Sequence, residues 1–173
     1  GTQWYYSVSI DVSARLIEII ADQPLDAFLH EKIFAPLGMS DMAFCLSEEK
    51  QQRVAAMYGG VDLCGPNVSW TTLMDVWERG INQRLDVSAT APIDDPSFLR
   101  GGLGLNSTIE DYFRFTQMLL NKGQLDGVQI LGPRTVDFMH MNHVDPKLLP
   151  IGFQDIKLLG YGFGLGSRAM LNV

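Results

Sequence analysis

The sequence predicts a mainly helical fold with a few short strands. Apolar residues recur at helical spacing over residues 10–21 and again over about 109–121. Proline and glycine stand where such helices should begin or end. Alternation with period two is clear over residues 160–166, which predicts a strand. A chain of 173 residues with 46% hydrophobic composition can bury the core of one domain.

The first two predicted helices cover residues 10–21 and 25–34. Ser9 is the expected N-cap of the first, with Asp11 in a first turn where the helix dipole favours an anion. Pro24 suits the first turn of the second, and Gly38 can supply a left-handed cap beyond its end.

The middle of the chain is less regular. Residues 42–44 are expected to be a short extended piece, and residues 59–100 an irregular insertion with a short helix over 71–78. Long irregular loops in compact domains often form the walls or lids of sites.

Regular structure is expected again after residue 101. Ser107 and Glu110 have the spacing of a capping box for a helix that ends near residue 121, before Gly123. Residues 126–127 indicate a tight turn, and residues 132–133 open a helix to about 142. In the strand over 160–166, glycines leave one face bare, so that another element can pack closely against it.

The charge of the chain excludes some classes of partner. The formal net charge is −7, with no cluster of lysine and arginine, which argues against nucleic acid and anionic membranes. No apolar run reaches 18 residues, and no signal peptide is visible.

The sulfur and imidazole groups indicate neither a disulfide framework nor a metal site. Cys45 and Cys64 form no CxxC pair and are expected to be buried or half-buried thiols. The three histidines, His30, His140 and His143, lack ligand spacing with either cysteine, so no metal or organic cofactor is expected.

Tyr6 is the candidate catalytic residue. A phenol has a pKa of roughly 10, but it becomes a useful base when a nearby ammonium stabilises the phenolate. It could then deprotonate a serine hydroxyl and later protonate the leaving group. From the residue alone, a tyrosine before a helix is more often a packing residue.

A series of motifs resembles the serine β-lactamase-like hydrolases, and within them the carboxylesterases related to class C β-lactamases, often called family VIII. The resemblance covers nearly the whole chain apart from about 59–97, and it rests on the order of these motifs: Gly1-Thr2-Gln3-Trp4-Tyr5-Tyr6-Ser7-Val8-Ser9-Ile10-Asp11-Val12, Pro24-Leu25-Asp26, Ile33-Phe34-Ala35-Pro36-Leu37-Gly38-Met39, Gly101-Gly102-Leu103-Gly104-Leu105-Asn106-Ser107-Thr108, Leu131-Gly132-Pro133-Arg134-Thr135-Val136 and Gly160-Tyr161-Gly162-Phe163-Gly164-Leu165-Gly166.

The resemblance implies that this chain is the helical region of a β-lactamase/transpeptidase-like α/β fold, with residues 160–173 beginning the return to its sheet. It also implies an acyl-enzyme mechanism in which the lysine of a Ser-x-x-Lys motif and a tyrosine, matched here by Tyr6, activate the serine. The family's upstream Ser-x-x-Lys motif and its downstream glycine-rich or Lys/His-x-Gly motif are absent from these residues. Where β-lactamases have Tyr-x-Asn, this chain has Tyr6-Ser7-Val8, which favours esters over β-lactams or peptides.

Other motifs offer no better nucleophile or cofactor site. Ser47-Glu48-Glu49-Lys50 has the letters of Ser-x-x-Lys, but its charged neighbours indicate a solvated helical turn with Ser47 as N-cap. There is no Gly-x-Ser-x-Gly elbow, and the glycines at 102 and 104 lack the context of a dinucleotide-binding loop.

The sequence therefore predicts a serine hydrolase of carboxylesterase type that acts on a small-molecule ester or amide. A β-lactamase, a D-aminopeptidase or transesterase, and a noncatalytic helical binding module remain alternatives. We expect the 173 residues alone to show little or no hydrolase activity, to dock against the missing α/β portion of the protein, and to be capable of self-association through exposed apolar surface.

Overall fold

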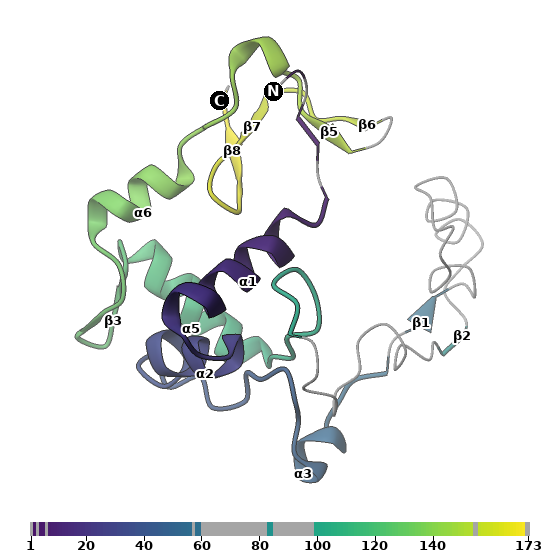
Figure 1. Ribbon diagram of the computed structural model, residues 1–173, viewed down its shortest axis with the longest axis vertical. Helices are drawn as coiled ribbons and strands as arrows, with labels where there is room; N and C mark the ends of the chain where they lie inside the picture. Colours follow the sequence, from purple (N-terminus) through teal and green to yellow (C-terminus); the bar gives the residue numbers. More distant parts are fainter. Residues whose placement is uncertain are drawn as a thin grey trace. The chain divides into compact units, whose positions relative to one another are not determined.

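The computed structural model describes residues 2, 4–5, 7–56, 58–59, 83–84, 99–153 and 156–171 (Figure 1). The chain divides into two compact units, one formed by residues 1–42 and 107–173, the other by residues 43–106. Helices outweigh strands within the described residues, and the strands form four two-stranded antiparallel sheets there. The predicted fold class, mainly helical with a few short strands, is confirmed.

The first helix of the first unit, α1, spans Ser9–Ala21, as the apolar spacing predicts. The predicted N-cap is wrong: Val8 is the cap, makes no side-chain hydrogen bond, and leaves Ser9 inside the helix. The reason is that the backbone of Val8 already lies close to the helical region (φ −78°, ψ 18°), and its carbonyl accepts from the Val12 N–H at 3.2 Å. Asp11 lies in the first turn as expected, and Asp22 ends the helix in the left-handed conformation.

The second predicted helix is present but changes its winding. The α-helix α2 spans Leu25–Leu29 and continues as a π-helical turn, η1, over His30–Phe34. In this turn the Ala35 N–H donates to the His30 carbonyl at 2.9 Å, five residues back rather than four. Pro24 is the N-cap, with ψ 149°, and not a residue of the first turn.

Gly38 follows this helix with φ +65°, as its predicted role as a left-handed cap requires. The apolar residues around it form the core of the first unit. Its buried members are Phe34, Leu37, Met39, Met42 and Met118; packed against them are Leu29, Ile33, Phe115, Leu119, Leu125 and Ile130.

The helix α5 spans Ile109–Leu120, close to its prediction, but its cap lies one residue later than predicted. Thr108 has the extended conformation of a cap, and its Oγ1 accepts from the Asp111 N–H at 3.2 Å. Ser107 instead donates its hydroxyl to the Thr108 carbonyl. The Asp111 side chain is buried and accepts from the Asp41 N–H at 2.7 Å, a link that the sequence did not reveal.

A tight hairpin follows α5. The strands β3, Gln124–Leu125, and β4, Val128–Gln129, pair antiparallel around the predicted turn, where Asp126 and Gly127 both have positive φ. Gly123 has φ +93°, and a Cβ there would collide with the backbone of Leu131, so the predicted stop requires glycine.

The last part of the first unit begins with α6, Pro133–His140, which has Gly132 as N-cap and ends two residues before the predicted end. A 3₁₀ turn, η3, spans Pro146–Leu148. Two hairpins follow, and the strand predicted over 160–166 is shorter than expected. The paired strands are β5, Gly152–Phe153, with β6, Ile156–Lys157, and β7, Tyr161–Phe163, with β8, Arg168–Met170.

The second unit contains the short helix α3, Glu48–Gln51, and the pair β1, Tyr58–Gly59, with β2, Gln83–Arg84. Ala43 forms an antiparallel bridge with Asn106, which agrees with the extended piece predicted over 42–44. The insertion predicted over 59–100 lies mostly outside the described residues, and the short helix predicted over 71–78 lies wholly outside them. Both stay predictions.

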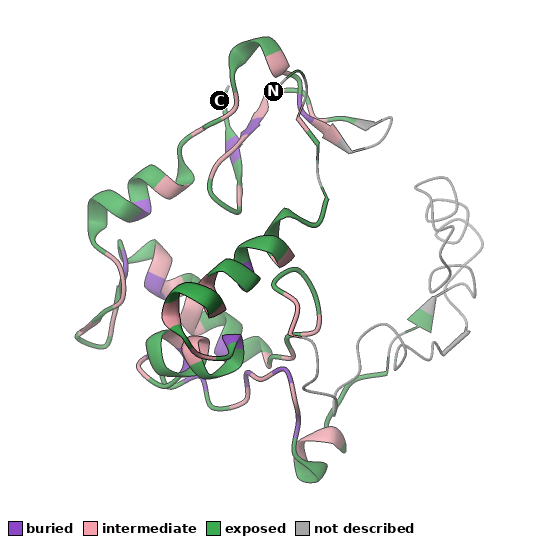
Figure 2. Ribbon diagram, viewed as in Figure 1, coloured by how far each residue is buried: buried purple, intermediate pink, exposed green. Residues whose placement is uncertain are grey.

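Several large apolar side chains of α1 are exposed, as are several of α5. Ala14 is the one buried residue of α1, and Figure 2 shows most of this helix in the colour of exposed residues. Ile19 and Ile20 are 61% and 83% exposed. None of the helices in the described ranges combines the length and apolarity that crossing a bilayer needs.

Candidate active site

Tyr6, the predicted general base, lies outside the described residues. Its chain neighbours Tyr5 and Ser7 are described, and α1 begins three residues after it. The structure describes what holds the residues on either side of it in the chain.

Trp4 contacts the strand β7. Its ring lies 5.3 Å from the ring of Phe163, centroid to centroid, with the planes tilted by 52°. Tyr5, by contrast, is 75% exposed.

The strand that carries Phe163 is built for close packing. Gly162 is paired with Ala169 of β8, and both are buried. A Cβ placed on Gly162 would collide with Oδ1 and Cγ of Asn142, and one on Gly164 would collide with the carbonyl of Met139. The prediction that the bare face of this strand admits a close neighbour is confirmed, and the neighbour is the segment that ends α6.

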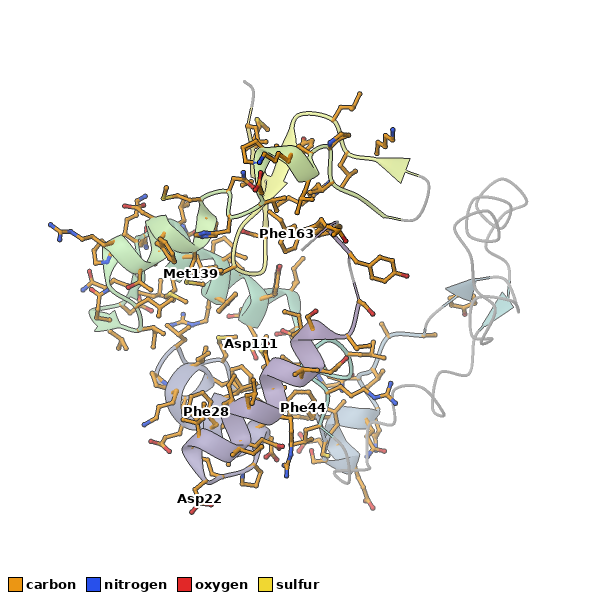
Figure 3. The ribbon with its side chains drawn as sticks, turned by 45° about the horizontal axis from the view of Figure 1, so that its top comes forward. Asp22, Phe28, Phe44, Asp111, Met139 and Phe163 are labelled. Carbon is orange, nitrogen blue, oxygen red and sulfur yellow. The ribbon has the colours of Figure 1, made fainter. Side chains whose placement is uncertain are left out.

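Asn142 makes the polar bonds of this contact between the end of α6 and β7; Figure 3 labels Met139 of α6 and Phe163 of β7. The Oδ1 of Asn142 accepts from the Phe163 N–H at 3.1 Å and from the Val144 N–H at 3.0 Å, while its Nδ2 donates to the Val144 carbonyl at 2.9 Å. The His143 N–H donates to the Phe163 carbonyl at 2.8 Å. Both backbone groups of Phe163 are thus bound by the residues that follow α6.

The sequence did not identify Asn142. The run of glycines predicted that something would pack on the strand, but nothing in the sequence named the partner. An asparagine just beyond a helix end readily bonds the backbone two residues on, and here it also reaches a strand 21 residues away.

The two histidines of this region have structural partners. The ring Nδ1 of His140 lies 2.8 Å from the Val136 carbonyl, and Nε2 of His143 lies 2.8 Å from the Phe138 carbonyl. These bonds agree with the capping or surface roles predicted from the sequence. Within the ranges that the structure describes, no three His, Cys, Asp or Glu residues gather as a metal site would require.

Ser47 is the exposed N-cap of α3, as predicted. Its Oγ accepts from the Lys50 N–H at 3.4 Å, and the helix has only four residues. This places the hydroxyl at the surface and in a capping bond, unlike a nucleophile at the start of a buried helix. Cys45 is half-buried, and Cys64 lies outside the described residues.

Glu18 connects the far end of α1 to α2. Its Oε2 accepts from Arg15 Nη1 at 2.7 Å, and its Oε1 accepts from the Leu25 N–H at 3.1 Å. The hydrogen bond from Arg15, followed by that from Leu25, lowers the pKa of the Glu18 carboxyl below its ordinary value of 4.5. The carboxylate therefore fixes the helix that follows residue 6 against its neighbour in the chain.

The family model described as Beta-lactamase matches residues 1–170. Among curated proteins, the chain is 34% identical over 166 residues to Protein Rv1367c of Mycobacterium tuberculosis, covering 95% of this chain and 37% of that protein. It is also 30% identical over 148 residues to monacolin J acid methylbutanoyltransferase of Aspergillus terreus, covering 86% of this chain and 31% of that protein. The chain thus spans about a third of the length of these relatives.

The fold is similar to that of a solved enzyme. The LovD6 mutant of simvastatin synthase from Aspergillus terreus superposes with a TM-score of 0.74 at 26% sequence identity. The match covers 99% of this chain and 40% of that one. The described helices and hairpins are therefore those of part of a β-lactamase/transpeptidase-like fold.

Proposed function

The chain belongs to the beta-lactamase family, and from this premise we propose that the protein carrying it is a serine hydrolase of carboxylesterase type, with Tyr6 as its general base. One observation carries the proposal: the segment Trp4-Tyr5-Tyr6-Ser7-Val8 directly precedes α1 in a chain that the family model matches from residue 1 to 170. In the serine β-lactamase-like hydrolases that the chain resembles, the catalytic tyrosine has the same place in the order of motifs.

In the proposed reaction, the serine of a Ser-x-x-Lys motif elsewhere in the protein attacks the carbonyl carbon of the ester. Tyr6, held as phenolate by the lysine ammonium, takes the proton of the serine hydroxyl. The bond to the alcohol breaks as Tyr6 returns that proton to the leaving oxygen. Water then attacks the acyl-serine, gives a proton to Tyr6, and the serine recovers its hydrogen as the acid departs.

Val8 supports an ester over a β-lactam. It occupies the position at which β-lactamases have the asparagine of Tyr-x-Asn, and its side chain, 64% exposed, has no group that could bond a substrate amide. A site that recognises a substrate amide through a hydrogen bond loses much of its preference for amides when the asparagine that makes this bond is replaced by an apolar residue.

Acyl transfer is the second candidate, favoured by the 30% identity to monacolin J acid methylbutanoyltransferase. Both activities share the acyl-enzyme and differ in whether water or another alcohol removes the acyl group. The two are separated by measuring, in the presence of a small alcohol, how much acyl group appears as a new ester and how much as free acid.

We propose further that the 173 residues alone have little turnover. Their one Ser-x-x-Lys sequence begins at Ser47, an exposed helix cap. An assay of the isolated chain with a p-nitrophenyl ester should therefore stay at background. Saturable turnover that disappears on Ser47→Ala would contradict this.

The main experiment compares Tyr6→Phe with Tyr5→Phe in the full-length protein. Removing the general base should lower kcat/KM for p-nitrophenyl butyrate by about 10²- to 10⁴-fold. Tyr5→Phe, which removes a phenol from an exposed neighbour, should leave it within about threefold. Equal activity of the Tyr6→Phe and wild-type proteins, or faster turnover of nitrocefin than of the ester, would overturn the proposal.

A further inference from the structure

We propose that Asn142 is a positioning residue for the candidate active site: by clamping β7 it fixes Phe163, which in turn fixes Trp4 and the chain leading to Tyr6. The functional part of this inference rests on the proposed role of Tyr6. Its structural part, that Asn142 orders residues 4–8, does not.

The first link is the binding of Phe163. Its N–H donates to Asn142 Oδ1 and its carbonyl accepts from the His143 N–H, so the backbone of this residue is bound on both sides. The Leu165 N–H continues the contact by donating to the Met139 carbonyl at 2.8 Å. The end of α6 therefore behaves like an extra partner for β7, with the asparagine amide taking the place of a backbone carbonyl.

The second link is the glycine opposite the amide. A side chain on Gly162 would occupy the space of Asn142 Oδ1 and Cγ, so the strand and the amide fit only because this glycine has no Cβ. The Val144 N–H and carbonyl bond the same amide and fix its orientation. A side chain held by three bonds to backbone groups has little freedom to follow a moving strand.

The third link joins the strand to the N-terminal segment. The rings of Phe163 and Trp4 are 5.3 Å apart, a separation at which aromatic pairs contribute about 0.5–1.5 kcal/mol beyond the area that they bury. Residue 6 lies two residues from this contact and three from the start of α1. A general base must be placed accurately, because a misplacement of about 1 Å can cost about 10²-fold in rate.

The structural part is tested by hydrogen exchange measured by mass spectrometry on the full-length protein. Asn142→Ala should raise the exchange rate of peptides that cover residues 4–8 and 160–166 by about tenfold. Asn142→Asp keeps an oxygen that accepts from the Phe163 and Val144 N–H groups, so it should restore most of the protection. Arg114→Ala is the matched control, because it removes bonds to the Leu37 carbonyl and to Asp126 elsewhere in the same unit.

The functional part is tested by ester kinetics, with rates normalised to the folded fraction. Asn142→Ala should lower kcat by about 10- to 100-fold with little change in KM, Asn142→Asp should recover most of the loss, and Arg114→Ala should leave kcat within about twofold. Because Asn142 acts through the aromatic contact, Trp4→Leu combined with Asn142→Ala should lose no more than the larger single effect.

The outcomes separate this inference from the proposed function. Unchanged exchange at residues 4–8 in Asn142→Ala, or a normalised kcat equal to that of the wild type, would overturn the positioning role. If Tyr6→Phe is fully active, the proposed function fails, while the exchange data still decide whether Asn142 orders the segment.

Discussion

Two regions of the first unit are held together by different means. The region around α2, η1 and α5 packs apolar side chains on Met118, which is 1% exposed, and on Leu37 beside it. The region from α6 to β8 also buries apolar side chains, Ile151 among them, but adds the Asn142 amide, backbone bonds to β7 and glycines that admit close contact. Buried apolar groups supply stability in proportion to the surface that they remove from water, whereas hydrogen bonds between a few polar atoms fix the direction in which elements approach. We therefore expect core substitutions to cost the most stability, and substitutions at Asn142 or the glycines to cost less stability while disturbing the geometry of β7.

The largest effect should come from Met118→Ala. Deleting a fully buried side chain removes its transfer free energy and leaves a cavity, which together cost about 2–5 kcal/mol of the free energy of unfolding. Urea denaturation of the protein measures this change. Leu120→Ala, on the exposed side of the same helix, is the control and should stay within about 0.5 kcal/mol. Similar losses for the two variants would contradict the description of this core.

Gly164→Ala tests the other region. Its Cβ would meet the Met139 carbonyl, so the hairpin must shift away from α6 at a cost of about 1–3 kcal/mol. Gly132→Ala is the control, since a Cβ there meets only the Thr135 Oγ1 at 3.8 Å, and we expect a change under about 1 kcal/mol. If Gly164→Ala unfolds at the urea concentration of the wild type, the close approach of these elements is not important for stability.

A smaller effect distinguishes the two candidate caps of α5. Thr108→Ala should lower the free energy of unfolding by about 1 kcal/mol, because it removes the acceptor for the Asp111 N–H. Ser107→Ala should change it by less than about 0.5 kcal/mol. The reverse order, measured in parallel by urea denaturation, would restore the cap predicted from the sequence.

The smallest effect should be the pH dependence contributed by Glu18. Its pKa in the folded state is lowered, chiefly by the hydrogen bond from Arg15, so its stabilising contribution is present above its ordinary value of 4.5 and is lost as pH falls through the lower folded value. The urea midpoint should therefore drop less steeply between pH 5 and about 3 in Glu18→Gln than in the wild type. Parallel curves would show that the bonds to Arg15 and Leu25 do not contribute.

The sequence predicted helices better than it predicted their first residues. Apolar spacing located α1 and α5, because burial of one face repeats over several turns and tolerates exceptions. A cap depends on the conformation of a single residue, and the predicted caps Ser9 and Ser107 each lie one position from the residue that adopts it. Likewise, nothing in the local pattern distinguishes the π turn from an α-helix.

The candidate site divides in the same way. The motif around Tyr6 and the bare face of the glycine strand could be found from the sequence, since both are local patterns. Asn142 and Asp111 could not, because their roles depend on bonds to residues 21 and 70 positions away. Long-range polar contacts depend on how the elements pack against one another, and a single sequence does not specify this packing.

The π turn at His30–Phe34 has a consequence for changes in chain length. It uses one residue more than an α-helical turn, while Phe34 at its end and Leu37 just beyond it remain buried. Removing a residue elsewhere in this helix would rotate all later side chains by about 100° and turn both out of the core. Within the wide turn, a deletion can be absorbed by tightening to ordinary helical winding, so this is where evolution or an engineer could shorten the helix at least cost.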